Sequence, residues 1–388
     1  MVRKNNDIHI FTPLTTTTNM KLIILKNNII EGLNSVERAI SNVSNLPILK
    51  NLLIKTDGGR IVFTCTNLEI AITHTVPGKI VEEGEITIPL SVFAPVAKNL
   101  NTERISLEAK DSHVLVTTDN YEATIQAQNA KDFPIIPGVS DKDKAVKMPA
   151  EKLLDALQSV FVATQYSEIR PEISGVFFHI FDNEVTLAAT DSFRLAERVV
   201  KIEDVQTQQN EVSMIVPYKT AEELLRFLTN SNGDVELFIE QNQVLFKTNS
   251  KQLISRLVDG VFPEYKAIIP KQIQNEAVLN RDEFINALKL TSSFSGRGNN
   301  VTITIGENKK FLELSSADSS VGENHYKIPI KLKGEPFSIV FNWRYLLDGL
   351  KIYSSEDITL GVNTADRPAI LKNPTEAKLV YVVMPIKS

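Results

Sequence analysis

The sequence predicts an α+β protein made of three copies of one domain. Three features of the 388-residue chain support this prediction. A pair of amphipathic helices recurs in each third, a turn-forming Asn or Asp recurs between the two helices, and most of the remaining chain has the pattern of β-strands. A chain of this length has room for two or three domains.

The first helix of each third is predicted from apolar residues spaced three or four positions apart. Leu33, Leu157 and Leu288 occupy equivalent places in these helices and lie 124 and 131 residues apart. The predicted ranges are Leu25–Ile40, Met148–Phe161 and Leu279–Leu290.

The second helix of each third repeats with the same period. The predicted ranges are Pro89–Leu100, Pro217–Leu228 and Asn342–Tyr353, and their first residues are 128 and 125 positions apart. Proline suits a helix start because its missing N–H has no intrahelical partner there. Asn342 is a good N-cap for the third helix.

A third landmark lies between the two helices. Asn67, Asp191 and Asp318 each follow an alternating, strand-like segment and are 124 and 127 residues apart. Short helices and such turns are common singly, but three landmarks with one period make chance agreement improbable. The repeat is therefore a property of the whole chain.

The rest of each third reads as β-strands joined by hairpins. Turn signals such as Asp57-Gly58-Gly59 and Phe181-Asp182-Asn183 separate pairs of alternating or β-branched segments. Each third is expected to hold about eight strands and two helices, since helices that bury one face need a sheet to pack on.

Domain boundaries are expected at two polar stretches. The first is the charged run Asp141–Lys144, and the second is Lys271–Glu276, which follows Pro270. The Thr15–Thr18 run is of low complexity, so the first residues are expected to be a disordered extension. The expected divisions are 1–19 for this extension and 20–143, 144–271 and 272–388 for the three domains.

Composition excludes several classes of protein. Lys plus Arg number 42 and Asp plus Glu number 47, so the net charge of −5 does not favour bulk electrostatic binding of DNA. The single cysteine, Cys65, excludes an internal disulfide and a multi-cysteine metal site. The five histidines form no HxH or HxxxH pair, and no segment has the length of a membrane span or a signal-peptide core.

Catalytic motifs are lacking in the sequence. It has no phosphate-binding GxxxxGK[ST] loop, no complete dinucleotide-binding glycine pattern and no GxSxG elbow. Asp191 and Arg194 could form an acid–base pair in an enzyme of unfamiliar type, although such a pair at a strand end more often closes a turn. A binding or scaffold protein is favoured over that alternative.

Seven segments, correctly ordered along the chain, resemble a known family. They are Ser44–Ile54, Lys131–Pro137, Ile169–Phe178, Ala188–Ala196, Leu257–Lys271, Phe341–Leu350 and Tyr381–Lys387. In combination these segments resemble bacterial DNA polymerase sliding clamps, the beta subunits of DNA polymerase III. The resemblance covers Met20–Ser388.

The resemblance implies a processivity factor without catalytic activity or cofactor. Two chains, joined head to tail, would form a ring of six clamp-fold domains whose twelve helices line a hole for duplex DNA. Encirclement would then supply DNA retention without sequence preference, which fits the weak bulk charge. The implied location is the cytoplasm, with no membrane partner. The implied partners are the polymerase III alpha subunit, a separate clamp loader, other polymerases and repair proteins.

The resemblance also carries site residues over to this chain. A partner-peptide cleft between the second and third domains is expected at Arg170, Ile173, Thr190, Ser192, Arg194, Leu195, Pro263, Ile268, Asn342, Tyr345, Val382, Met384, Pro385 and Ile386. A shallow apolar groove with a polar rim suits a short peptide with aliphatic and aromatic anchors. No residue is expected to bind metal.

Basic residues of the six helices are expected to face DNA, and Lys219 matches a family position associated with DNA contact. The set is Lys26, Arg38, Lys98, Lys152, Lys219, Arg226, Arg281, Lys289, Arg344 and Lys351. At the dimer interface, Ala123 and Ile125 on an edge strand are expected to meet Leu290 and Thr291 at a helix end.

Three positions depart from the family pattern. Many relatives have a basic residue at the position of Val43, and some have Arg at the position of Ala267. The ending Ile386-Lys387-Ser388 is a variant of the usual one. The first departure removes one expected DNA contact, and the other two are expected to retune partner preference.

Overall fold

The structure, a computed structural model, describes residues 19–387 except 41–45, 140–144, 203–210 and 230. Val43, the run Asp141–Lys144, Ser388 and all but the last residue of the predicted extension therefore lie outside the described residues. The chain forms two compact units. The first comprises the described residues up to Pro137 with Ser250–Gln252, and the second comprises the remaining residues from Gly138 onward.

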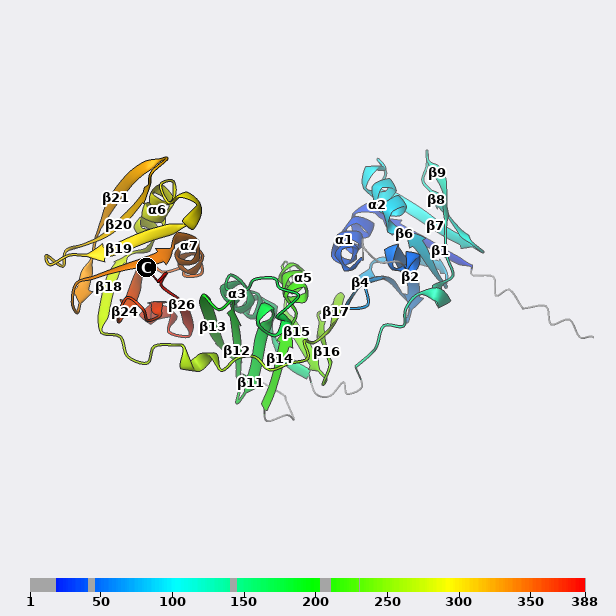
Figure 1. Ribbon diagram of the computed structural model, residues 1–388. Helices are drawn as coiled ribbons and strands as arrows, with labels where there is room; N and C mark the ends of the chain where they lie inside the picture. The colour runs from blue at the N-terminus through cyan, green and yellow to red at the C-terminus, as the bar shows by residue number, and fades with distance from the viewer. Residues whose placement is uncertain (1–18, 41–45, 140–144, 203–210, 230, 388) are drawn as a thin grey trace, which may run out of the picture. The chain divides into compact units, whose positions relative to one another are not determined.

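Within the described residues, each third of the chain has a strand, a long helix, four or five strands, a second long helix and three strands, and the second third adds one short helix (Figure 1). The first third contains β1 (Met20–Leu25), α1 (Lys26–Val36), β2 (Asn51–Asp57), β3 (Arg60–Thr66), β4 (Ile70–Val76), β5 (Gly78–Glu82), β6 (Glu85–Pro89), α2 (Leu90–Asn99), β7 (Arg104–Lys110), β8 (His113–Thr117) and β9 (Glu122–Gln126). The second contains β10 (Ala145–Pro149), α3 (Ala150–Phe161), α4 (Pro171–Ser174), β11 (Val176–Phe181), β12 (Glu184–Thr190), β13 (Arg194–Lys201), β14 (Glu211–Val216), α5 (Tyr218–Leu228), β15 (Asp234–Ile239), β16 (Gln243–Lys247) and β17 (Lys251–Arg256). The third contains β18 (Asn275–Asn280), α6 (Arg281–Ser292), β19 (Asn300–Ile305), β20 (Phe311–Asp318), β21 (Gly322–Pro329), β22 (Lys331–Lys333), β23 (Phe337–Asn342), α7 (Trp343–Lys351), β24 (Asp357–Val362), β25 (Ala369–Lys372) and β26 (Leu379–Val383).

Short 3₁₀ turns complete the secondary structure of the described residues. They span Glu37–Ala39, Pro47–Lys50, Ala130–Asp132, Tyr265–Ala267, Gly296–Gly298 and Pro374–Glu376. The prediction of an α+β fold with three repeated clamp domains is confirmed.

One backbone hydrogen bond marks the repeat. The first residue of each long leading helix donates its N–H to a carbonyl that follows the second helix of the same third: Lys26 to Glu103, Ala150 to Gly233 and Arg281 to Glu356, at 2.8–3.0 Å. The first N–H groups of a helix have no intrahelical acceptor. This bond satisfies one of them and ties the two helices of each domain together.

The long helices begin slightly later than the sequence analysis predicts. The N-cap residues of α2, α3, α5 and α7 are Pro89, Pro149, Pro217 and Asn342, and each helix begins at the next residue. The preceding strand runs directly into these helices, so its last residue has extended rather than helical backbone. At the other end, α1 stops at Val36 and continues as the 3₁₀ turn, short of the predicted Ile40.

Tight hairpins occur at both glycine- or Asx-rich signals named above. Gly58 and Gly59 have φ of 54° and 74° in the turn between β2 and β3. Asp182 and Asn183 have φ of 46° and 62° between β11 and β12. Two consecutive left-handed residues match the right-handed twist of the paired strands, and Gly, Asn and Asp tolerate that conformation best.

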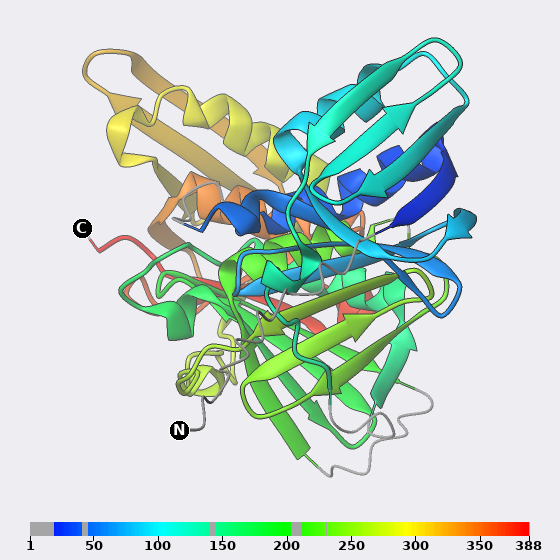
Figure 2. The same cartoon turned by 90° about the vertical axis from the view of Figure 1, so that its right-hand side faces the viewer.

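In the first unit, one sheet has the order β5-β1-β7-β8-β9, and β4, β3, β2 and β6 are neighbours in a second sheet. Strands β7 to β9 run side by side as a meander that is visible in Figures 1 and 2. Because β9 pairs only with β8 among the described strands, it is an edge of its sheet.

In the second unit, a nine-stranded sheet crosses from the second domain to the third. Its order is β14-β11-β12-β13-β26-β25-β24-β18-β22, and the crossing point is the antiparallel pair β13–β26. The third domain also has a four-stranded sheet, β21-β20-β19-β23, in which β21 and β23 are the edges. Strands β10, β15, β16 and β17 are neighbours in that order.

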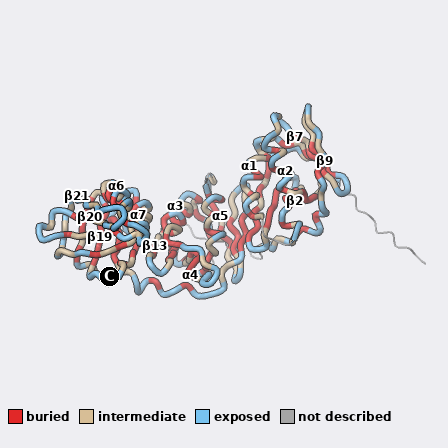
Figure 3. The backbone as a smooth tube through the Cα atoms, turned by 45° about the horizontal axis from the view of Figure 1, so that its top comes forward, coloured by how far each residue is buried: buried red, intermediate tan, exposed pale blue. Residues whose placement is uncertain are grey.

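Buried residues lie along the strands and recur at intervals along the helices (Figure 3). A cluster of apolar residues spans the β13–β26 crossing. Leu195 and Ile215 come from the second domain, and Ile370 and Val382 come from the third. Phe262, which packs with them, belongs to residues 257–270, the connecting segment between the two domains. The two domains therefore share one piece of core. Among the described residues, no helix is long and apolar enough to cross a membrane.

Candidate functional site

The turn between β12 and β13 lies where the second and third domains meet. Asp191 Oδ1 accepts hydrogen bonds from the N–H groups of Phe193 and Arg194, at 2.9 and 3.0 Å. Ser192 is held with φ of 78°, and its N–H donates to Thr190 Oγ1. The turn closes as an Asx turn, as the sequence analysis preferred, and it fixes Arg194 at the start of β13.

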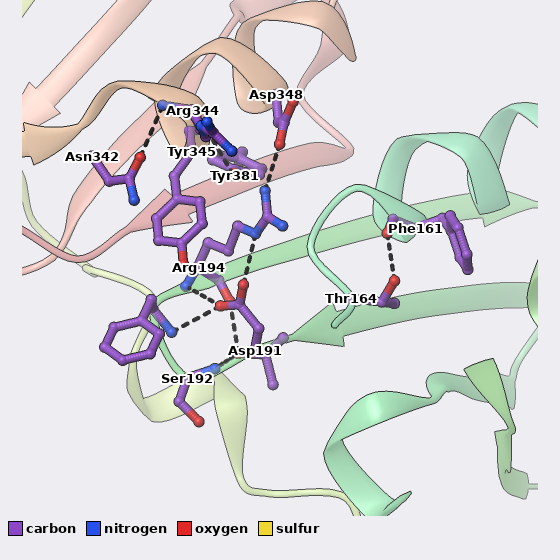
Figure 4. A network of polar contacts seen from close by, with 12 residues as sticks. Phe161, Thr164, Asp191, Ser192, Arg194, Asn342, Arg344, Tyr345, Asp348 and Tyr381 are labelled. Carbon is purple, nitrogen blue, oxygen red and sulfur yellow. Dashed lines mark hydrogen bonds and ion pairs between the residues drawn. The ribbon is translucent and has the colours of Figure 1, made fainter. Parts of the chain in front are cut away.

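Arg194 links this turn to the last helix (Figure 4). Its Nε donates to Asp191 Oδ2 at 2.8 Å and its Nη1 to Asp348 Oδ2 on α7 at 2.7 Å, while the guanidinium lies 4.5 Å from the centre of the Tyr345 ring. The Arg194 and Asp191 side chains are only 11% and 1% exposed. Burial alone lowers the pKa of Arg194, but Tyr381 and the two carboxylates raise it above its usual value, so the side chain remains a cation.

The same turn occurs in the other two domains without the arginine. Asn67 Oδ1 accepts from Glu69 and Ile70, and Asp318 Oδ1 accepts from Ser320. The three landmark residues thus have one backbone role. Only the turn at Asp191 combines that role with a buried ion pair that reaches another domain.

A cleft of about 680 Å³ opens beside this junction. Its walls come from the β12–β13 turn, the segment after the 3₁₀ turn at Tyr265–Ala267, the loop between β24 and β25, and the end of β26. Leu195 and Val382 are register partners across β13 and β26, so they form adjacent parts of the floor. The lining residues are Thr190, Ser192, Arg194, Leu195, Ala267, Ile268, Ile269, Pro270, Lys271, Gln274, Asn363, Thr364, Arg367, Pro368, Val382 and Met384.

An aromatic group adjoins the cleft. The Phe193 ring, 58% exposed, stacks on the Tyr345 ring with 6.4 Å between their centres. Met384 N–H donates to the Phe193 carbonyl at 2.8 Å, and Ile386 N–H donates to the Val340 carbonyl. The chain beyond β26 is therefore held against both domains.

Half of the predicted cleft residues line the cleft, and the other half, including Tyr345 and Asn342, do not. Thr190, Ser192, Arg194, Leu195, Ile268, Val382 and Met384 line the cleft. Tyr345 contacts Arg194, and Asn342 caps α7 by accepting from Arg344 N–H. The others lie outside the lining: Arg170 and Ile173 at α4, Pro263 in the connecting segment, and Pro385 and Ile386 after β26.

The sequence analysis missed part of the cleft. It did not include the loop residues Asn363, Thr364, Arg367 and Pro368, nor Gln274. The loop has ordinary turn composition, and only the tertiary pairing of β25 with β26 brings it to the cleft. Lys271 and its neighbours belonged to a recognised segment, but no local signal assigned them a role.

The residues expected to face DNA lie on or beside the six long helices. Lys26 and Arg281 are half-buried, and their side chains donate to the carbonyls of Leu100 and Tyr353, at or just beyond the ends of α2 and α7. A cation there interacts well with the helix dipole. Lys98, Arg226 and Lys351 are exposed and form ion pairs with nearby carboxylates. Arg38, Lys152, Lys219, Lys289 and Arg344 are exposed too.

The four residues expected at the dimer interface differ in exposure. Ala123 and Ile125 do lie on the edge strand β9, but Ile125 is only 4% exposed and belongs to the core of its own domain. Leu290 on α6 is 47% exposed, whereas Thr291 is buried and its hydroxyl donates to Asn324 Oδ1 on β21. Leu290 is thus a half-exposed apolar side chain near the end of α6.

The structure also bears on two other kinds of reactive site, a nucleophilic cysteine and a metal site. Cys65 is buried in β3, and burial raises the pKa of its thiol, so it is not a reactive nucleophile. Among the described residues, no group of three or more His, Cys, Asp or Glu side chains is placed to hold a metal ion.

Three family models match the chain in succession. They describe the N-terminal, central and C-terminal domains of the DNA polymerase III beta subunit and match residues 20–137, 147–264 and 266–387. The chain belongs to this family, the bacterial sliding clamps. The beta sliding clamp of Staphylococcus epidermidis is 28% identical over 379 residues, which cover 95% of this chain and all of that protein.

Solved structures agree with this assignment. The DNA polymerase sliding clamp of Bacillus subtilis is 26% identical with a TM-score of 0.91, covering 96% of this chain and 100% of that one. The sliding clamp of Bartonella birtlesii, solved bound to griselimycin, is also 26% identical, with a TM-score of 0.88 over 95% of this chain and 100% of that one.

Family membership decides between a binding protein and an enzyme, the two classes that the sequence left open. A sliding clamp is a non-catalytic processivity subunit for DNA polymerase, so this chain is a processivity factor. The alternative of an uncharacterised enzyme at Asp191 and Arg194 is not supported. Those two residues instead stabilise the junction beside the cleft.

The repeated turn allows the ion pair to be tested against a matched control. Asn67→Ala removes only the turn acceptor and should lower the free energy of unfolding by about 1 kcal/mol. Asp191→Ala removes the same acceptor and leaves Arg194 with one carboxylate fewer, so we expect a loss of about 3 kcal/mol. Urea unfolding of the two variants would measure both losses, and equal losses would show that the ion pair contributes nothing.

Proposed function

We propose that two copies of this chain join head to tail in a ring that encircles duplex DNA and slides along it in the cytoplasm. The cleft would tether the DNA polymerase III alpha subunit, the clamp loader, other polymerases and repair proteins in turn. We also propose domain boundaries at 20–143, 144–271 and 272–388. The observation that carries the proposal is the succession of three clamp domains together with an apolar cleft at the β13–β26 junction.

The basic residues on the helices support weak, sequence-independent DNA contact. Arg38, Lys152, Lys289 and Arg344 are exposed, and none forms an ion pair with a carboxylate among the described residues. Lys219 lies over the Tyr166 ring at 5.0 Å and remains exposed. Exposed ion pairs such as that of Arg226 are worth little, so their cations could exchange a carboxylate for a phosphate. Such contacts suit a ring that must slide.

The edge strands β9 and β21 support the proposed dimer. Each presents unpaired backbone groups to a second chain, and pairing between them would extend both sheets. Leu290 lies on α6, which packs beside β21, and its exposed side chain would be covered in such an interface. Ile125 would contribute through its backbone, because its side chain is already buried.

Retention on DNA should depend on topology. Clamp loaded on nicked circular DNA should stay bound through gel filtration and should be lost once the circle is cut, because free ends let a ring slide off. Bulky proteins fixed at both ends of the cut DNA should restore retention. Persistent binding to linear DNA with free ends would contradict encirclement.

Leu290→Asp should give a folded monomer, because a charge at this half-exposed apolar position opposes burial in an interface. Sedimentation velocity would measure the mass, and circular dichroism the fold. Val81→Asp, at a 52% exposed position on the opposite edge strand β5, should remain a dimer. Ile125→Asp is unsuitable because it would place a charge in the core of the first domain. A dimeric Leu290→Asp variant would place the interface elsewhere.

Met384→Ala should weaken binding of a short peptide with aliphatic and aromatic anchors. Central apolar anchors typically cost about 2 kcal/mol when truncated, or roughly thirtyfold in Kd. Ser192→Ala, at the exposed rim, should change Kd by less than about threefold. Fluorescence anisotropy of a labelled peptide would measure both values. Equal, unchanged affinities would remove Met384 from the binding site.

A further inference from the structure

Two cations lie along one wall of the cleft. Lys271 follows the connecting segment, and Arg367 belongs to the loop between β24 and β25; both line the cleft and both are exposed. Hydrogen bonds of 2.9 and 3.0 Å join Asn363 to Gln274 and Gln272, so the two segments lie side by side. The fold thus brings Lys271 and Arg367, which are far apart in the sequence, to the same wall of the cleft.

The charges of this wall, which we call the basic wall, are not balanced inside the cleft. Arg194, the third cation of the lining, is already paired with Asp191 and Asp348. No Asp or Glu occurs among the described residues that line the cleft. Neither Lys271 nor Arg367 forms an ion pair with another described residue.

Asp366 is the nearest carboxylate in sequence, and it is partly engaged elsewhere. It accepts a hydrogen bond from the Thr364 hydroxyl at 2.6 Å and does not line the cleft. That hydrogen bond, a backbone hydrogen bond and, to a lesser extent, the charges of Arg367 and Lys387 lower the pKa of Asp366. One carboxylate outside the lining cannot balance both Lys271 and Arg367, so the basic wall keeps an excess of positive charge.

We propose that the cleft selects partner peptides that carry an acidic residue beside their apolar anchors, with the carboxylate directed at Lys271 and Arg367. This inference rests on the proposed function of the cleft as a peptide-binding site. The floor of Leu195, Val382 and Met384 accepts apolar anchors, which favours a peptide over a nucleic acid. Rim charges of this kind mainly set specificity and association rate.

Among the described residues of the lining, Lys271 and Arg367 are the two that give the cleft its unpaired positive charge. Ala267 adds no charge to the lining, and Lys271 and Arg367 supply it from the neighbouring segments. The expected gain is modest, because exposed pairs are screened by water and salt. Two such contacts should tighten binding of an acidic peptide by about threefold to tenfold at low salt.

The test uses labelled peptides of equal length that share one aliphatic–aromatic core. Their flanks are Gln-Gln, or Glu-Glu before the core, or Glu-Glu after it. Fluorescence anisotropy would measure the Kd of each peptide for the full-length dimer at 50 and 500 mM salt, because exposed charges are screened weakly at the first concentration and strongly at the second. The test variant is Lys271→Gln with Arg367→Gln. The control is Lys331→Gln with Lys333→Gln, which removes two exposed cations from β22 at the far edge of the same sheet.

The proposal expects one Glu-flanked peptide to bind tighter than the Gln-flanked peptide at low salt, and less so at high salt. The preference should vanish in the test variant and persist in the control. Equal binding of all peptides, or a preference that survives in the test variant, would overturn the inference and leave the cleft's function intact. Failure of every peptide to bind would overturn both. Displacement of the peptide by single-stranded DNA at similar concentration would assign the basic wall to nucleic acid and overturn the inference.

Discussion

The pairing of β13 with β26 is the contact on which the functional part of the structure depends. It makes one sheet out of strands from two domains, and it sets Leu195 beside Val382 in the cleft floor. Ile215 and Ile370 bury their side chains in the same cluster, together with Phe262 of the connecting segment. Because backbone pairing and apolar burial act together there, the second and third domains hold one fixed arrangement, and the cleft has a defined shape before any partner arrives.

The polar contacts of the junction add specificity more than stability. Arg194 and Asp191 are nearly buried, and removing two charges from water offsets much of their attraction. The pair mainly fixes the orientation of the Arg194 side chain. Asp191 uses one oxygen to close the turn and the other to hold Arg194, which then reaches Asp348 on α7. A displacement of the third domain by a few ångströms would break the contact between Arg194 and Asp348, although Arg194 would stay paired with Asp191, so the second carboxylate favours one docking of the two domains.

The repeat could be predicted from sequence because its signals are local. The spacing of Leu33, Leu157 and Leu288 reflects helix faces that each pack on a sheet, and the Asx turns need only one side chain and nearby backbone. The cleft is a tertiary feature. Its central residues were identified through resemblance, whereas Asn363 and Arg367 reach it only because β25 pairs with β26. The burial of Ile125 shows a further limit, since membership of an edge strand does not reveal which face a side chain occupies.

The late place of β26 in the order of the strands has a consequence for synthesis. This strand lies between β13 and β25, yet its residues, Leu379–Val383, are synthesised after those of every other described strand. Until then β13 and β25 each have an open edge, and the floor of the cleft is missing. The cleft therefore cannot form until β26 has emerged, which makes the joining of the second and third domains a late step of folding during synthesis.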